Sequence, residues 1–163
     1  MNEDKISEIV ADAVSKFGGG KMCITLDKAK KLADIIEKKA REIGVNAVVA
    51  ISDTGANPIL IECMDNAFIA SYDIALNKSY TAVALKMSTA RLKTISQPGD
   101  ELYGIQFTNN GRIVIFGGGD PLEYNGNIIG GLGVSGGSES EDTYLSAYGA
   151  SQIAKIMKGD MQE

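Results

Sequence analysis

Hydrophobic residues recur at helical spacing after Thr25, on the face formed by Leu26, Ala29, Leu32, Ala33, Ile36, Ala40 and Ile43. Thr25 is a favourable N-cap, and Asp27 in the first turn suits the positive end of the helix dipole. Gly44 is a residue type that commonly ends helices, so the pattern predicts an amphipathic helix between Thr25 and Gly44. Residues 3–17 show the same periodicity and predict an earlier helix, which three glycines at 18–20 separate from the rest.

Stretches rich in Val, Ile and Ala follow the first long helix. Residues 46–52 and 58–64 predict strands, and the short polar segment 53–57 between them predicts an antiparallel hairpin. A second pair of strands is predicted at residues 112–116 and 127–134. Both pairs have short connections, which favours an antiparallel sheet over a parallel one.

The remaining segments complete the pattern. Residues 67–87 are mostly small and apolar, which predicts a helix covered on most sides by a sheet or by a neighbouring subunit. Residues 88–110 are expected to be irregular or short-helical. Ser138 and Glu141 have capping-box spacing and open a last helix. The order α-α-β-β-α-(α)-β-β-α predicts an α+β fold, with an antiparallel β-sheet flanked by α-helices. We expect an N-terminal amphipathic arm with its glycine joint at 1–20 and one folded domain at 21–163.

Composition then narrows the classes of function. The chain has 163 residues, a formal charge of −5 and no histidine. An acidic chain whose lysines alternate with carboxylates is a poor partner for nucleic acid. Neither a secretion signal nor a run of about 18 apolar residues that could span a bilayer is present, so we expect a cytoplasmic protein. Cys23 and Cys63 stand alone and are expected to be reduced, packed thiols.

Two glycine motifs near the C-terminus resemble functional motifs but lack their partners. Residues 131–136 match GxGxxG, yet dinucleotide binding requires a further parallel strand and an acidic residue about twenty positions on, which we do not expect before Glu163. Residues 133–137 match GxSxG around Ser135, whose activation in that motif requires a histidine base. The glycines are expected where backbone approaches backbone or takes a positive φ, and the same bare backbone can line a ligand pocket.

The charged residues give no metal site. Glu139, Glu141 and Asp142 are expected to favour a helix N-terminus rather than to bind a cation. Asp73 and Lys78 lie five positions apart on the helix predicted at 67–87. They either pair with each other or extend to opposite edges of that helix, and a role in ligand binding is a further alternative.

Seven short blocks occur in a distinctive order between residues 24 and 157. They are ISDTG at 51–55, MDNA at 64–67, SYDIA at 71–75, KSYTA at 78–82, QPG at 97–99, FGGGDPL at 116–122 and GGLGVSGG at 130–137. Together these blocks resemble the GlcG/HbpS-like family, and most closely the C-terminal domain of PduO-type proteins from propanediol-utilisation systems.

The resemblance implies a profilin-like antiparallel sheet flanked by helices, assembled into symmetric homo-oligomers. It also implies binding of a tetrapyrrole, either haem (with haem degradation in some members) or a corrinoid in cobalamin metabolism inside bacterial microcompartments. The adenosyltransferase activity of PduO-type proteins belongs to their other domain and is not carried over. Haem-binding relatives are expected to use an axial histidine, so haem iron here has to be held by Tyr72, Tyr80, Cys63 or Met64, or by no protein residue.

Three hypotheses follow from these observations. The first is an oligomeric accessory protein that binds a tetrapyrrole or a related small metabolite, in the cytoplasm or associated with a microcompartment. The second is a scaffolding oligomer that has lost the family ligand. The third, ranked last because no acid–base pair can be identified, is an enzyme acting on a small acid or aldehyde, or on haem. No catalytic residue is assigned, and residues 1–20 either stay free or dock onto a microcompartment shell or an enzyme. The candidate ligand-binding residues are Asp53, Cys63, Met64, Tyr72, Lys78, Tyr80, Gly117, Gly118, Gly119, Pro121 and Ser135.

Overall fold

The computed structural model describes residues 22–159, so the arm expected at 1–20 lies outside the described part of the chain. The elements, in chain order, are α2 (Leu26–Glu42), β1 (Val48–Ser52), β2 (Pro58–Cys63), α3 (Ser71–Ala84), α4 (Thr89–Lys93), the 3-10 turns η1 (Ile105–Phe107) and η2 (Asn109–Gly111), β3 (Gly119–Tyr124), β4 (Asn127–Ser135) and α5 (Glu139–Lys158). This order confirms the α+β class expected from the sequence.

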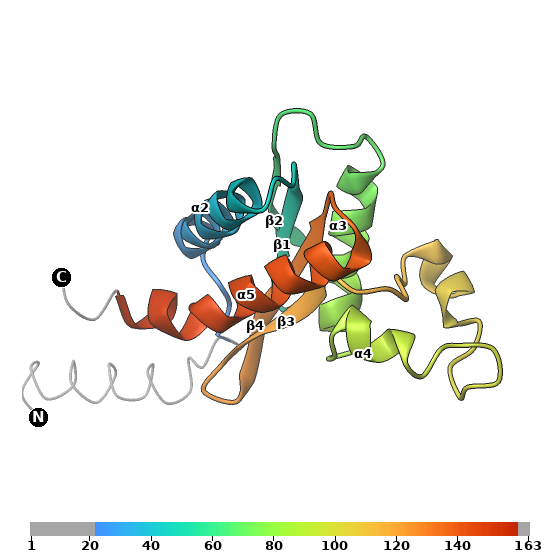
Figure 1. Cartoon of the computed structure of the whole chain (residues 1–163). Coiled ribbons are helices and arrows are strands. Elements are labelled where there is room, and N and C mark those ends of the chain that lie inside the picture. The colour runs from blue at the N-terminus through green and yellow to red at the C-terminus, as the bar shows by residue number, and fades with distance from the viewer. Residues whose placement is uncertain (1–21, 160–163) are drawn as a thin grey trace, which may run out of the picture.

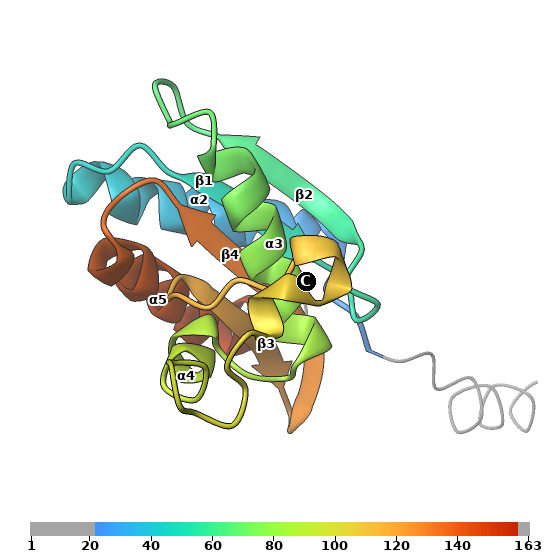
Figure 2. The same cartoon turned by 90° about the vertical axis from the view of Figure 1, so that its right-hand side faces the viewer.

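The four strands of the described residues form one antiparallel sheet in the order β2-β1-β4-β3. Helices α2 and α5 cover one face of this sheet, and α3 crosses the other (Figures 1 and 2). Every residue of β1 is buried, because this central strand is covered on both faces. The opposite is true of β2, an edge strand in which no residue is fully buried. The predicted hairpin of β1 and β2 is confirmed.

Side chains from α2, α5 and the sheet form the larger core. Leu32 and Ile36 of α2 and Leu145 of α5 pack against Val49 and Leu132 of the sheet, and each of these side chains is fully buried. Burial of one such side chain stabilises a fold by about 1.5–3 kcal/mol. This face therefore supplies most of the hydrophobic stabilisation of the domain.

The opposite face is built for close backbone approach. Gly131 and Gly133 of β4 point at α3, and a Cβ added to Gly133 would lie 2.0 Å from the carbonyl oxygen of Ala75. A Cβ at Gly131 would lie 2.5 Å from the carbonyl oxygen of Ser79. The expectation that these glycines permit backbone to approach backbone is confirmed, since any side chain here would push α3 off the sheet.

The strand predicted at residues 112–116 is wrong. The third strand is β3, which begins at Gly119, and residues 112–116 run beside α3 instead. The Thr81 hydroxyl donates to the carbonyl oxygen of Arg112 (3.2 Å), and the Val114 N–H donates to the Thr81 hydroxyl oxygen (3.0 Å). The segment has a strand-like composition, but its backbone pairs with a helix side chain because β3 occupies the place beside β4.

The predicted helix caps are confirmed. The Thr25 side chain accepts from the Lys28 N–H, and Ser138 and Glu141 form a complete capping box at the start of α5. The helix predicted at 67–87 is shorter than expected, because residues 65–70 form turns before Ser71. Among residues 22–159, no helix combines the length and apolar character needed to cross a membrane.

Candidate functional site

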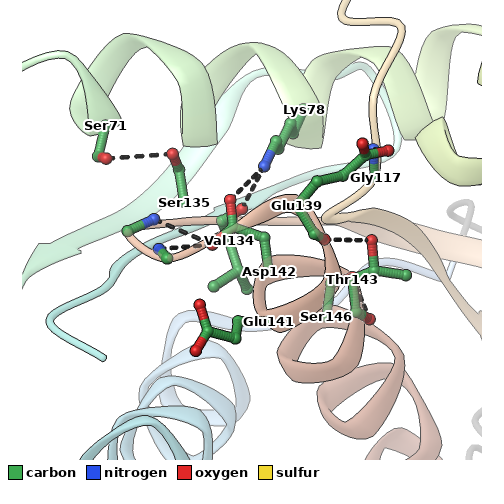
Figure 3. Close-up of polar contacts among 12 residues, drawn as sticks. Ser71, Lys78, Gly117, Val134, Ser135, Glu139, Glu141, Asp142, Thr143 and Ser146 are labelled. Carbon is green, nitrogen blue, oxygen red and sulfur yellow. Dashed lines mark hydrogen bonds and ion pairs between the residues drawn. The ribbon is translucent and has the colours of Figure 1, made fainter. Parts of the chain in front are cut away.

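A buried ion pair joins α3 to α5 at the glycine-rich segments (Figure 3). Lys78 Nζ donates to Asp142 Oδ2 at 2.7 Å and to the carbonyl oxygen of Val134 at 2.9 Å. The side chains of Lys78 and Asp142 are 0% and 5% exposed. Asp142 Oδ1 accepts the N–H groups of Gly136 and Gly137, both at 3.0 Å. Asp142 thus connects the end of β4 to the first turn of α5. The ion pair with Lys78 connects α3 to the same carboxylate.

Burial and the neighbouring carboxylate have opposite effects on the charge of Lys78. Burial lowers the pKa of Lys78, while the hydrogen bond from its ammonium to Asp142 acts to raise it. The Phe116 ring lies 4.9 Å from the ammonium nitrogen, which places the ring's negative face towards the cation. Because its side chain has no exposed surface, Lys78 acts here as a structural cation rather than a group that a ligand reaches.

Glu139 extends this cluster to the surface. Its Oε1 accepts the Gly117 N–H at 3.0 Å, and its Oε2 accepts from Lys93 Nζ at 2.6 Å. These two hydrogen bonds, the one from Gly117 first, lower the pKa of Glu139. Of the alternatives left open for Asp73 and Lys78, the structure pairs Lys78 with Asp142 and leaves Asp73 exposed. The role of Asp142 as the partner of Lys78 was not predicted from the sequence. Its carboxylate was attributed to the favourable effect of negative charge in the first turn of a helix.

Three of the sequence candidates, Cys63, Ser135 and Tyr72, lie at one end of the sheet. Val48 is in register with Cys63 of β2 and with Ser135 of β4, so these three residues form one row across the strands. The Ser135 hydroxyl donates to the Ser71 hydroxyl at 3.1 Å, which places the first turn of α3 over this row (Figure 3). Tyr72 follows Ser71 directly.

Exposed side chains are concentrated in the segment that leads from the end of β2 into α3. Phe68, Ile69 and Tyr72 are 71%, 97% and 46% exposed. Cys63 at the end of β2 is exposed as well, so the expectation of a packed thiol is wrong for this residue, which lies on an edge strand. We call these four residues the 63–72 surface. Isolated apolar side chains are common on protein surfaces, but several large ones gathered near one helix end indicate a contact with another molecule.

The remaining candidates lie elsewhere, several of them held by their own contacts. Met64 packs against the α2–α5 core, and its sulfur accepts the Ala47 N–H. The Tyr80 ring lies 3.6 Å from the Arg112 guanidinium carbon. Asp53 Oδ1 accepts the N–H groups of Gly55 and Asn57, which closes the β1–β2 turn and lowers the pKa of Asp53.

The glycine block at 117–119 lies against α3, α4 and α5. A Cβ at Gly118 would lie 2.5 Å from Lys78 Nζ, and the Gly119 N–H donates to the Thr89 hydroxyl at 2.9 Å. Pro121 lines a separate open groove of about 420 Å³ near the end of α3. The candidates therefore do not form one site.

The charged residues of that groove were not identified from the sequence. Lys86, Arg91, Asp120 and Glu123 line it beside Pro121. Asp120 lies in the FGGGDPL block, whose glycines and Pro121 were candidates, but its carboxylate was not predicted to take part in a site. Among the described residues, no group of three or more His, Cys, Asp or Glu side chains is placed to hold a metal ion.

Comparison with known proteins connects this fold to others. An uncharacterised 15.0 kDa protein from the dhaT–dhaS intergenic region of Citrobacter freundii is 50% identical over 123 residues, which are 76% of this chain and 87% of that protein. The corrinoid adenosyltransferase PduO of Salmonella typhimurium is 40% identical over 125 residues, which are 77% of this chain and 36% of PduO. The chain thus spans about a third of PduO.

Solved structures agree with these matches. Klebsiella pneumoniae ORFY has a TM-score of 0.79 at 45% identity, over 81% of this chain and 91% of ORFY. A PduOC:heme complex has a TM-score of 0.78 at 33% identity, over 81% of this chain and 96% of that one. The structure of HbpS gives 0.72 at 25% identity, over 83% and 96% of the two chains. The family model for the haem-degrading protein HbpS-like matches residues 24–151, and the chain therefore belongs to the HbpS-like family.

Proposed function

We propose that this chain is a tetrapyrrole-binding accessory protein, and that haem or a corrinoid binds at the 63–72 surface. The observation that carries the proposal is the likeness to the PduOC:heme complex, which extends over 96% of that chain at a TM-score of 0.78. PduOC forms a complex with haem, and this chain has the same fold over 81% of its length.

The residues of the 63–72 surface fit such a ligand in chemical type. The sequence contains no histidine, so an axial ligand to haem iron has to be another side chain. Tyrosine and cysteine both ligate haem iron in proteins, and Tyr72 and Cys63 are exposed at this end of the sheet. Phe68 and Ile69 offer apolar area against which a macrocycle can pack. When bound, the tetrapyrrole would supply the metal chemistry, and the protein would supply the apolar contact and the axial donor.

Self-association is part of the same proposal. Exposed aromatic side chains also occur at Tyr103 and Phe107, which are 62% and 81% exposed. Apolar surface of this kind supports a homo-oligomer whose subunits cover one another. The 40% identity to part of the corrinoid adenosyltransferase PduO supports a role in cobalamin-linked metabolism, in the cytoplasm or in a microcompartment.

A hemin titration of the full chain, followed by its visible spectrum, tests the proposal beside a parallel titration with a corrinoid. We expect a saturable change with one equivalent of one of the two ligands. If hemin binds, Tyr72→Phe or Cys63→Ser should change the spectrum and weaken binding about tenfold, the equivalent of about 1.4 kcal/mol. The matched controls Tyr103→Phe and Cys23→Ser lie outside the 63–72 surface and should leave both unchanged.

Two outcomes would contradict the proposal. A linear, non-saturating response to both ligands would favour the scaffolding hypothesis. Saturable binding that neither Tyr72→Phe nor Cys63→Ser affects would place the tetrapyrrole elsewhere on the protein.

A further inference from the structure

The open groove of about 420 Å³ lies at the other end of α3 from the 63–72 surface. Lys86 and Met87 follow the C-terminus of α3, Arg91 belongs to α4, and Asp120 and Glu123 come from β3. Helix α3 has 14 residues, so its ends are about 20 Å apart at 1.5 Å per residue. The volume lies within the 300–1,000 Å³ that is typical of small-molecule sites, and the groove is distinct from the surface assigned to the tetrapyrrole.

Lys86 holds an unfavourable backbone conformation at this groove. It follows the C-cap of α3 with φ = 54°, in the left-handed region where glycine is favoured. Helix α2 ends in the same way, but there the left-handed position after the C-cap is Gly44, with φ = 75°. The chain thus places a lysine where a glycine would be the stable choice. Residues kept in such conformations against their intrinsic preference concentrate at functional sites.

The groove is lined by charged side chains of both signs. Within residues 22–159, the structure records no ion pair for Lys86 or for Arg91, and both are exposed. Asp120 Oδ2 accepts the Ser146 hydroxyl at 2.6 Å, which leaves Oδ1 free of any recorded hydrogen bond in the same part of the chain. Burial raises the pKa of Asp120, while the hydrogen bond from Ser146 acts to lower it.

We propose that this groove binds a small organic phosphate that carries a hydroxyl group. Lys86 and Arg91 hold the phosphate, since guanidinium and ammonium groups form charge-assisted hydrogen bonds to its oxygens. Asp120 Oδ1 accepts a hydrogen bond from the hydroxyl. Glu123 also lines the groove and is exposed, so a ligand with a second anionic group is disfavoured.

Calorimetric titration of the full chain with glycerol 3-phosphate tests this proposal, with inorganic phosphate and glycerol as the two partial ligands. We expect saturable binding of glycerol 3-phosphate, weaker binding of phosphate and none of glycerol. Arg91→Met should weaken binding about tenfold or more, as expected for the loss of a hydrogen bond to a charged group. Lys86→Gly should weaken it to a similar extent and, at the same time, raise the melting temperature, because glycine relieves the left-handed backbone.

Ala56→Gly is the matched control, since Ala56 also has a positive φ (62°) but lies in the β1–β2 turn, outside the groove. This variant should bind glycerol 3-phosphate as tightly as the parent chain. The proposal is overturned if glycerol 3-phosphate does not saturate, or if Arg91→Met and Lys86→Gly bind it as tightly as the parent. Hemin or corrinoid titrations of the same variants should be unchanged, so this result is independent of the tetrapyrrole proposal.

Discussion

Replacing Lys78 by methionine should be the most destabilising single loss of a charge in the described part of the chain. Methionine keeps most of the side-chain length and its contact with Phe116, but it leaves the Asp142 carboxylate buried without its cation. Removing one partner of a buried ion pair costs about 3–5 kcal/mol. This is a large share of the roughly 5–15 kcal/mol by which a typical domain is stable.

A second substitution isolates the electrostatic part of this cost. Asp142→Asn removes the buried negative charge and keeps an oxygen that can accept the Gly136 or the Gly137 N–H. The double variant Lys78→Met/Asp142→Asn therefore leaves no unpaired charge at this site. Its destabilisation should be smaller than the sum of the two single effects by about 1–3 kcal/mol.

Urea unfolding followed by circular dichroism measures these free energies, provided that the dependence of stability on urea is the same for all variants. Lys93→Met is the control, because the Lys93–Glu139 pair has similar geometry but side chains that are 46% and 37% exposed. An exposed pair contributes about 0–1 kcal/mol. If Lys78→Met costs no more than Lys93→Met, or if the effects in the double variant are strictly additive, the buried ion pair does not contribute to stability as described.

Three further predictions concern packing, capping and pH. Gly133→Ala should destabilise the protein by about 3 kcal/mol or more in urea unfolding, because its Cβ would overlap the Ala75 carbonyl, whereas Gly159→Ala, with no atom within 4 Å of the added Cβ, should have little effect. Ser138→Ala removes the N-cap of α5 and should cost about 1 kcal/mol by the same assay; an unchanged midpoint would show that the capping box contributes nothing. Because burial raises the pKa of Asp120 above its ordinary value of 3.8, the folded state retains a proton that the unfolded chain has lost, and stability from this group falls as pH rises through the raised pKa. The melting temperature of Asp120→Asn should therefore increase relative to that of the parent chain as pH rises above about 4, and an identical pH profile for both proteins would contradict this account.

Local patterns were sufficient for most of the elements. The periodicity after Thr25, the Ser138–Glu141 spacing and the short connection at 53–57 each predicted an element that the structure contains. These signals depend on residues a few positions apart, within which backbone geometry and capping are decided. The same local information failed at residues 112–116, whose composition fits a strand although their backbone bonds to Thr81 of α3.

The candidate sites were predicted less well than the fold. The sequence identified Lys78 but offered Asp73 as its nearest partner, whereas the structure joins it to Asp142, 64 positions away. Lys86 and Arg91 belong to no sequence motif and were not predicted as site residues. They line one groove because α3, α4 and β3 meet there. A charge pair between distant residues depends on which faces pack together, and that information is not local.

The order of the antiparallel α+β elements and the positions of the helix caps follow from local sequence patterns, and the lack of histidine restricts the chemistry available to the chain. Packing between distant segments settles which strand lies beside β4, which carboxylate neutralises Lys78, and which large side chains stay exposed. The physical reason is that hydrogen-bonding periodicity and capping act over a few residues. Burial of charge and shape of a groove arise only when segments far apart in the chain are packed against one another.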